Sequence, residues 1–221
     1  MDTQILPTDD DVAHRGAAFI VEQARLAVAA RGSFHFAFSG GKTPWVMLRD
    51  LSQVPLPWPQ IHIYQVDERI APEGHDDRNL THLREAFTAP LPAENLHAMP
   101  VNDTDLDAAV RRYAGLFANQ SLDLVHLGLG PDGHTASLIP GDPVLNVADA
   151  DIALTGVYQN RRRMTMTYPL LNRSRQVLWL VTGESKAPVV PRLLAGDPSI
   201  PAGRIAQTHA LLLLDPSARG Q

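Results

Sequence analysis

The chain contains no cysteine among its 221 residues, which excludes disulfide bridges and thiolate chemistry. It has no excess of basic residues either: 19 Lys and Arg stand against 24 Asp and Glu, and the net charge is −5. We therefore expect no basic surface that binds nucleic acid. No apolar run approaches the roughly 20 residues that a membrane span needs, so we expect no membrane association.

The N-terminal segment, residues 1–11, is acidic and lacks the basic-then-apolar order of a signal peptide. Together with the absence of cysteine, this predicts a cytoplasmic protein. Hydrophobic residues make up 44% of the chain, enough for one sizeable α/β core. No repeat or low-complexity tract divides the sequence, and the proline-rich segment 54–59 is too short for a domain linker. We predict a single domain over residues 1–221.

Helix-like and strand-like patterns alternate along the chain, which is typical of an α/β fold with a parallel sheet. Strands are predicted at residues 34–38, 61–66, 122–127, 152–157, 176–181 and 210–215, and residues 161–167 alternate like a half-buried strand. Helices are predicted at about residues 10–30, 43–51, 79–86 and 106–119. The residues from 216 to 221 are expected to fray.

The most informative segment, residues 122–140, begins as a buried strand and then breaks into a glycine-rich turn. The turn carries Asp132 and His134 just beyond the strand, next to Gly130. Ligands of parallel α/β sheets bind at the carboxyl ends of the strands, where a carboxylate and an imidazole can transfer protons. The alternative is a plain strand-to-helix turn in which Asp132 caps the helix.

A second strand, at residues 34–38, ends in a loop that has the features of a phosphate site. The loop consists of Ser39, Gly40, Gly41, Lys42 and Thr43, and a helix pattern follows it. Adjacent glycines let backbone N–H groups approach a ligand, and the helix N-terminus attracts an anion. The spacing of a Walker loop is absent, so the loop is not a nucleotide-binding P-loop.

Two further segments carry charge at predicted strand ends. Asp67 and Arg69 share one face of the chain after residues 61–66, while Glu68 takes the other face; a surface salt-bridge cluster is the alternative. Lys186 follows the strand at 176–181, where a helix should start. A cation is unfavourable at a helix start, and a bound anion would resolve that conflict.

Taken together, these segments resemble the 6-phosphogluconolactonase family. The matching motifs are Ser39-Gly-Gly-Lys-Thr-Pro44, Asp67-Glu-Arg69, Gly128-Leu-Gly-Pro-Asp-Gly-His-Thr-Ala-Ser137, Arg163-Met-Thr165 and Gly183-Glu-Ser-Lys186, in the family's order. The resemblance implies a Rossmann-like three-layer fold with a mainly parallel central sheet and helices on both faces. It also implies hydrolysis of 6-phospho-D-glucono-1,5-lactone to 6-phosphogluconate, a step of the oxidative pentose phosphate pathway.

The resemblance also suggests roles for the site residues. Arg163 and Lys186 would hold the phosphate with the loop 39–43, and Asp67 and Gly130 would contact the substrate. His134 would accept a proton from water. Asp132 would orient substrate hydroxyls or polarise the imidazole, and Arg69 or backbone N–H groups would stabilise the oxyanion. A competing mechanism uses Ser137 as nucleophile, on a helix start facing His134; it ranks second because no nucleophile elbow surrounds that serine.

We expect no metal, because no His-Glu-x-x-His or similar ligand spacing occurs. We expect no cofactor either. His35, His62 and His126 lie within strand patterns and are expected to pack there. The predicted partner is a small sugar-phosphate lactone, and the chain is expected to be a monomer or a weak homo-oligomer.

Two other functions remain as alternatives. A glucosamine-6-phosphate deaminase or isomerase is disfavoured, because that group has tyrosine where this chain has Arg69 and a catalytic glutamate where it has Ile139. A non-catalytic sugar-phosphate sensor would not require Asp132 and His134. One departure from the lactonase pattern stands out: the family's usual Ser-Asn pair is Arg78-Asn79 here. Asn79 can still cap the helix, and Arg78 reaches either the ligand or solvent.

Overall fold

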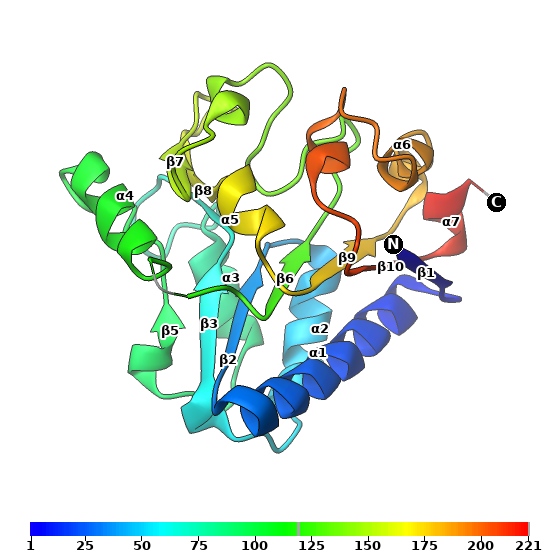
Figure 1. The fold of residues 1–221 in the computed structure, drawn as a ribbon, viewed down its shortest axis with the longest axis horizontal. Coiled ribbons are helices and arrows are strands. Elements are labelled where there is room, and N and C mark those ends of the chain that lie inside the picture. Colours follow the sequence, from blue (N-terminus) through cyan, green and yellow to red (C-terminus); the bar gives the residue numbers. More distant parts are fainter. Residues whose placement is uncertain (119, 221) are drawn as a thin grey trace.

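The computed structural model describes residues 1–118 and 120–220, and at its centre lies a seven-stranded sheet in the order β1-β10-β9-β6-β2-β3-β5 (Figure 1). Its strand pairs all run parallel. The strands are β1 (Asp2–Ile5), β2 (Phe34–Phe38), β3 (Ile61–Gln65), β5 (Leu96–His97), β6 (Leu124–Leu127), β9 (Val177–Val181) and β10 (Ala210–Leu214).

Helices cover both faces of this sheet, which confirms the predicted α/β class. They are α1 (Asp9–Arg31), α2 (Lys42–Ser52), α3 (Asn79–Ala86), α4 (Leu106–Gly115), α5 (Tyr168–Asn172), α6 (Val190–Leu194) and α7 (Pro216–Arg219). Because side chains alternate along a strand, Phe36 of β2 packs in the core with α1, α2 and α3, whereas Ala37 packs in the core with α4, α5 and α6. No helix in the described part of the chain is long and apolar enough to cross a membrane.

A second, three-stranded antiparallel sheet lies above the carboxyl ends of the central strands (Figure 1). It joins β4 (Asp67–Arg69) to β8 (Arg163–Met166) and β8 to β7 (Ile152–Leu154). The sequence did not predict this sheet, because β4 follows β3 after a single residue and reads as its continuation. The predicted alternation of residues 161–167 is correct as strand, but all four residues of β8 are buried.

The order of strands reverses between β2 and β6. From β2 the chain proceeds outward through β3 to β5, and from β6 it proceeds in the opposite direction through β9 to β10. In open α/β sheets such a reversal leaves a crevice at the carboxyl ends of the two neighbouring strands, which is where ligands bind. The loops that follow β2 and β6 are the two glycine-rich segments singled out in the sequence.

Most predicted elements are confirmed, with shifts at their ends. Helix α1 begins after Thr8, whose side chain accepts a hydrogen bond from the N–H of Asp11 at 3.1 Å, and ends at Gly32 with φ 81°. The helix predicted at 106–119 is wrong beyond Gly115, where a poor helix former ends it; Asn119 lies outside the described residues.

Two other predictions need correction. The strand predicted at 152–157 ends at Leu154, and the N–H of Gly156 instead donates to Asp142 Oδ2 at 2.9 Å. The predicted fraying of residues 216–221 is wrong for the short helix α7. That helix begins because Asp215 Oδ1 accepts a hydrogen bond from the N–H of Ala218 at 2.9 Å. Gln221 lies outside the described residues.

A stack of histidines lies near the amino ends of β2 and β3 and on the short strand β5. The rings of His35 and His62 lie 4.6 Å apart and nearly parallel, and His62 Nδ1 is 3.1 Å from His97 Nε2. His35 Nδ1 is also 3.0 Å from the hydroxyl of Tyr64. Burial, followed by the charge of His62, lowers the pKa of His35 to about 4. Burial also lowers the pKa of His62 and of His97.

These shifts predict a loss of stability in acid. Between about pH 6.5 and about pH 4, His35 is protonated in the unfolded chain but still neutral in the folded chain. The free energy of unfolding therefore falls as the pH decreases through this interval. Urea denaturation at a series of pH values measures the slope, and His35→Gln should flatten it. An unchanged slope in that variant would show that His35 does not contribute.

Candidate active site

A cavity of about 410 Å³ lies in the crevice between the carboxyl ends of β2 and β6. The described side chains and backbone that line it are Ser39, Gly40, Gly41, Lys42, Thr43, Pro44, Asp67, Arg69, Asn79, Gly128, Leu129, Gly130, Pro131, His134, Ala136, Arg163, Leu180, Val181, Thr182 and Lys186. The structure thus brings together every predicted site residue except Asp132, which lies directly behind His134.

His134 and Asp132 form the pair that is best suited to proton transfer. His134 Nδ1 lies 2.6 Å from Asp132 Oδ1, and the backbone N–H of His134 donates to the same oxygen at 3.1 Å. Burial raises the pKa of Asp132, but the hydrogen bonds and the charge of His134 outweigh it and leave that pKa below its usual value. An ionised Asp132 favours the proton on Nδ1 and leaves the Nε2 lone pair for a ligand. This geometry favours polarisation of the imidazole by Asp132.

Only glycine fits at position 130. A Cβ there would lie 2.1 Å from His134 Nδ1 and 2.7 Å from Asp132 Oδ1. The turn is closed by backbone hydrogen bonds from the N–H of Gly130 to the carbonyl of His134, at 2.8 Å, and from the N–H of Gly133 to the carbonyl of Gly130, at 3.0 Å. The close approach of backbone to imidazole holds the ring in its position.

The predicted helix start at Ser137 is wrong. The chain continues as a turn in which Thr135 pairs with Leu138, and the buried Ser137 Oγ donates a hydrogen bond to Asp67 Oδ2 at 2.6 Å. Ser39 Oγ donates to the other oxygen of Asp67 at 2.9 Å. Asp67 therefore joins the loop after β2 to the turn after β6, and the Ser137 hydroxyl is engaged away from His134.

The loop after β2 presents backbone N–H groups to the cavity. Gly41 precedes α2, and no side chain of the described residues caps this helix. The N–H groups of Lys42 and Thr43 therefore remain for an anion, whereas Pro44 has no N–H and Trp45 donates to the Gly41 carbonyl at 3.2 Å. Beneath the loop, the N–H of Ser39 donates to Nδ1 of the buried His126 at 3.3 Å. Burial lowers the pKa of His126 to about 3, so that ring is neutral and accepts this bond. Its expected packing within the strand is confirmed.

The cations of the cavity differ in how they are held. Arg163 is 4% exposed, and its Nε is buried without a hydrogen-bond partner among the described residues. Burial lowers the pKa of Arg163, against the charge of Asp67, and burial also lowers the pKa of Lys186. Lys186 lies in a short 3-10 turn after β9. Lys42 is different, because its exposed ammonium pairs with Asp9 at 3.1 Å.

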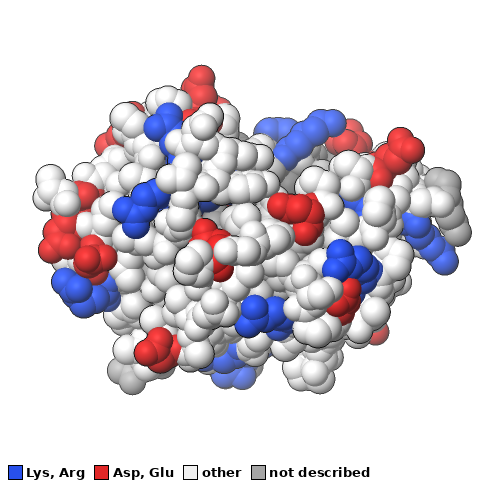
Figure 2. Space-filling model, turned by 90° about the horizontal axis from the view of Figure 1, so that it is seen from above, with Lys and Arg blue, Asp and Glu red and all other residues white. Residues whose placement is uncertain are grey.

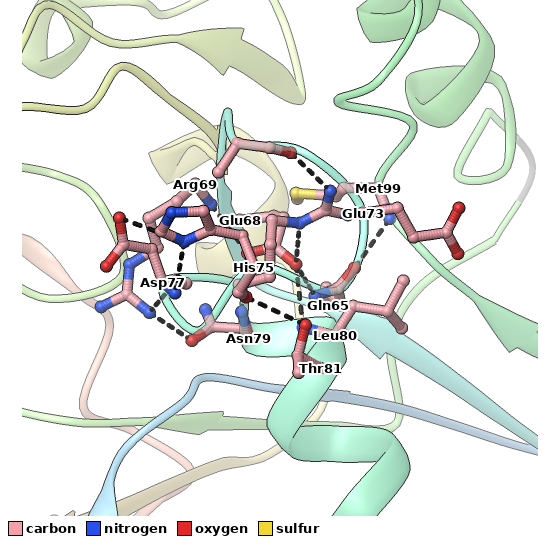
Figure 3. Close-up of polar contacts among 12 residues, drawn as sticks. Gln65, Glu68, Arg69, Glu73, His75, Asp77, Asn79, Leu80, Thr81 and Met99 are labelled. Carbon is pink, nitrogen blue, oxygen red and sulfur yellow. Dashed lines mark hydrogen bonds and ion pairs between the residues drawn. The ribbon is translucent and has the colours of Figure 1, made fainter.

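Arg69 reaches the cavity from β4, on the same side as Asp67, as the predicted alternation requires. Its Nη1 donates to Asn79 Oδ1 at 2.5 Å and to the carbonyl of Asp77 at 3.3 Å (Figure 3). The prediction that Asn79 caps the helix is wrong: Asn79 is the first residue of α3, and its side chain lines the cavity instead.

Tyr158 is a neighbour of the site that sequence reasoning missed. Its ring meets that of His134 edge-on at 5.7 Å, and the Arg163 guanidinium lies 5.1 Å from its centroid. The tyrosine hydroxyl donates to Asp132 Oδ2 at 3.4 Å. Tyr158 lies in the connection between β7 and β8. The sequence around it has no motif that would show that this connection packs against His134. No group of three His, Asp or Glu that could hold a metal ion occurs within residues 1–118 and 120–220.

Comparison with known proteins gives consistent matches. The family model described as Glucosamine-6-phosphate isomerases/6-phosphogluconolactonase matches residues 7–214. A 6-phosphogluconolactonase from Synechocystis sp. is 35% identical over 219 residues, which cover 92% of this chain and 91% of that protein. The crystal structure of a 6-phosphogluconolactonase from Thermotoga maritima matches with a TM-score of 0.87 at 24% identity, over 97% of this chain and 98% of that one.

A monomeric glucosamine-6-phosphate deaminase matches as well, with a TM-score of 0.87 at 19% identity, over 100% of this chain and 99% of that one. At such identities the two structural matches show a shared fold and nothing about the reaction.

The approach of Gly130 to the imidazole generates a prediction. Gly130→Ala should displace His134, change the ¹⁵N chemical shifts of its ring and cost about 1–3 kcal/mol of unfolding free energy by overpacking. Gly128→Ala is the matched control, because nothing lies within 4 Å of a Cβ at that position. Equal effects of the two substitutions, measured by NMR and urea denaturation, would contradict the prediction.

Proposed function

The chain belongs to the glucosamine-6-phosphate isomerase/6-phosphogluconolactonase family, and from this premise we propose that it hydrolyses the ester bond of 6-phospho-D-glucono-1,5-lactone to give 6-phosphogluconate. The observation that carries the proposal is the Asp132–His134 pair, which lies beside a cavity whose other walls carry the buried Arg163, the half-buried Lys186 and the N–H groups at the start of α2. A general base and an anion site in one cavity suit a substrate with a carbonyl at one end and a phosphate at the other.

In the proposed reaction, His134 Nε2 accepts a proton from water while the water oxygen attacks the lactone carbonyl. Asp132 stabilises the imidazolium that forms. Arg69 or the backbone N–H groups of the glycine turns donate to the oxyanion. When the tetrahedral intermediate collapses, the ring oxygen leaves and takes the proton from His134.

Arg163, Lys186 and the first turn of α2 hold the phosphate in this proposal. Arg163 suits the role because it lines the cavity while its side chain is held by the surrounding residues at 4% exposure. An arginine fork matches phosphate oxygens in geometry as well as charge. Gly40, Gly41, Lys42 and Thr43 line the same wall, and the exposed ammonium of Lys42 pairs with Asp9.

The residues favour hydrolysis over the family's other reaction. Ile139, at the position of the deaminase glutamate, is 6% exposed and aliphatic, so it cannot relay a proton. Arg69 replaces the deaminase tyrosine and contacts Asn79. A Ser137 nucleophile is disfavoured because its hydroxyl already donates to Asp67.

We further propose that the protein acts in the cytoplasm as a monomer or weak homo-oligomer and binds no nucleic acid. Support for the last point comes from the net charge of −5. On the face seen in Figure 2, basic and acidic side chains are interspersed and form no continuous basic field.

Hydrolysis of freshly generated lactone, coupled to 6-phosphogluconate dehydrogenase and corrected for spontaneous opening, tests the function. His134→Ala should lower the catalysed rate about 10²- to 10⁴-fold, the usual contribution of a general base, and leave binding of 6-phosphogluconate intact. Acceleration that persists in the variant would exclude His134 as the base. Binding without any acceleration by the parent protein would indicate a sensor.

Ser137→Ala separates the two mechanisms in the same assay. If water is the nucleophile, the variant keeps kcat within about tenfold of the parent, because it loses the hydrogen bond to Asp67 and a long one, at 3.4 Å, from Arg163 Nη1. A loss as large as that of His134→Ala, in a variant that remains folded by circular dichroism, would restore the serine mechanism.

The chain's two lysines provide a matched test of the phosphate site. Lys186→Met should raise KM about 10- to 100-fold with a smaller effect on kcat, because it removes a charge-assisted hydrogen bond. Lys42→Met should change KM less than about threefold, because its ammonium pairs with Asp9. The reverse order of effects would show that Lys42, and not Lys186, holds the phosphate, and would contradict the proposed site.

A further inference from the structure

Glu68 is a buried carboxylate for which the proposed reaction has no use. It lies between Asp67 and Arg69 but faces away from the cavity and is 0% exposed. Its Oε1 accepts hydrogen bonds from the N–H groups of Arg69 and Asn79, both at 2.8 Å, and its Oε2 accepts from Gln65 Nε2 and the N–H of Leu80, both at 2.9 Å (Figure 3). A charge buried so completely persists only when it is fully partnered.

The partners of Glu68 belong to the two elements that carry cavity residues. Arg69 is the last residue of β4, and Asn79 and Leu80 are the first residues of α3. Arg78, which precedes the helix, makes no side-chain cap. The Glu68 carboxylate therefore takes the place of the cap, and its negative charge also suits the positive end of the helix.

Arg78 supplies the opposite charge. Its Nε lies 3.0 Å from Glu68 Oε2, and its side chain is only 3% exposed. Its Nη1 donates to the carbonyl of Ala71 and to Asn102 Oδ1, both at 2.9 Å. Arg78 thus reaches neither the cavity nor solvent. It ties the loop between β4 and α3 to the segment after β5, a span that a serine at this position could not bridge.

Asn79 connects this buried ion pair to the residues that line the cavity. Its Nδ2 donates to the carbonyl of Asp67 at 3.0 Å, and its Oδ1 accepts from Arg69 Nη1 at 2.5 Å. A Cβ on Gly40 would lie 2.2 Å from the same Oδ1. The Asn79 amide therefore packs between Gly40 of the loop after β2 and the Arg69 side chain, and its position restricts the positions of both.

From these contacts we infer that Glu68 and Arg78 are a positioning pair for the reaction. The pair holds the backbone of Arg69 and Asn79, and Asn79 aims the Arg69 guanidinium at the ligand. Neither member touches substrate or moves a proton. This inference rests on the proposed function, in which Arg69 contacts the substrate.

A double-mutant cycle tests whether Glu68 acts through Arg69. Glu68→Gln keeps the shape but replaces one acceptor oxygen by a donor, which should lower kcat/KM and weaken binding of 6-phosphogluconate, each about 10- to 100-fold. In the Arg69→Ala background, the same substitution should change both quantities less than about threefold, since no guanidinium remains to be positioned. Equal losses in the two backgrounds would overturn the inference.

The control and the rescue use neighbouring residues. Glu73→Gln removes an exposed carboxylate from the loop that follows β4; this carboxylate pairs with the exposed Arg84, and its loss should leave both quantities unchanged. Should Glu68→Gln fail to fold, the cycle is run with Arg78→Met, and Arg78→Lys should recover part of the loss. An Arg78→Met variant with parental binding and kcat/KM would also overturn the inference. Because binding is measured alongside turnover, a parent protein that binds but does not hydrolyse would refute the proposed function and leave the test of positioning intact.

Discussion

The reversal of strand order between β2 and β6 is the constraint on which the rest of the site depends. Because the chain leaves these neighbouring strands in opposite directions, no crossover covers their carboxyl ends, and the two glycine-rich loops face each other across a crevice. The antiparallel sheet β4-β8-β7 then forms a third wall and contributes Asp67, Arg69 and Arg163. The cavity is thus built from segments distant in sequence.

Because side chains alternate along β4, its two adjacent carboxylates face opposite sides of the strand. Asp67 faces the cavity, where hydroxyls from Ser39 and Ser137 hold both of its oxygens. Glu68 faces the other way, toward the start of α3 and Arg78. Each buried charge is compensated locally, which a folded chain requires. Asp67 thereby holds the loop after β2, and Glu68 holds the backbone of Arg69. The Asp132–His134 pair remains open to the cavity.

Local patterns predict the parts of this structure that are local. An apolar run followed by glycines located the loops after β2 and β6, and helix-like patterns located α1 and α3. The pairing of Ser137 with Asp67, the contact of Tyr158 with His134 and the burial of Arg78 were not predictable, because each joins segments far apart in the chain. Lys42 lines the cavity and also pairs with Asp9 of α1, a neighbour that no sequence spacing reveals.

The central claim is that one cavity holds a phosphate at the start of α2 and places a carbonyl carbon beside His134. A crystal structure with 6-phosphogluconate bound tests it most directly. The account predicts the phosphate within hydrogen-bond distance of Arg163, Lys186 and the N–H groups after Gly41, and the carboxylate next to His134 Nε2. A carboxylate bound against Ser137, or a phosphate beside His134, would contradict it.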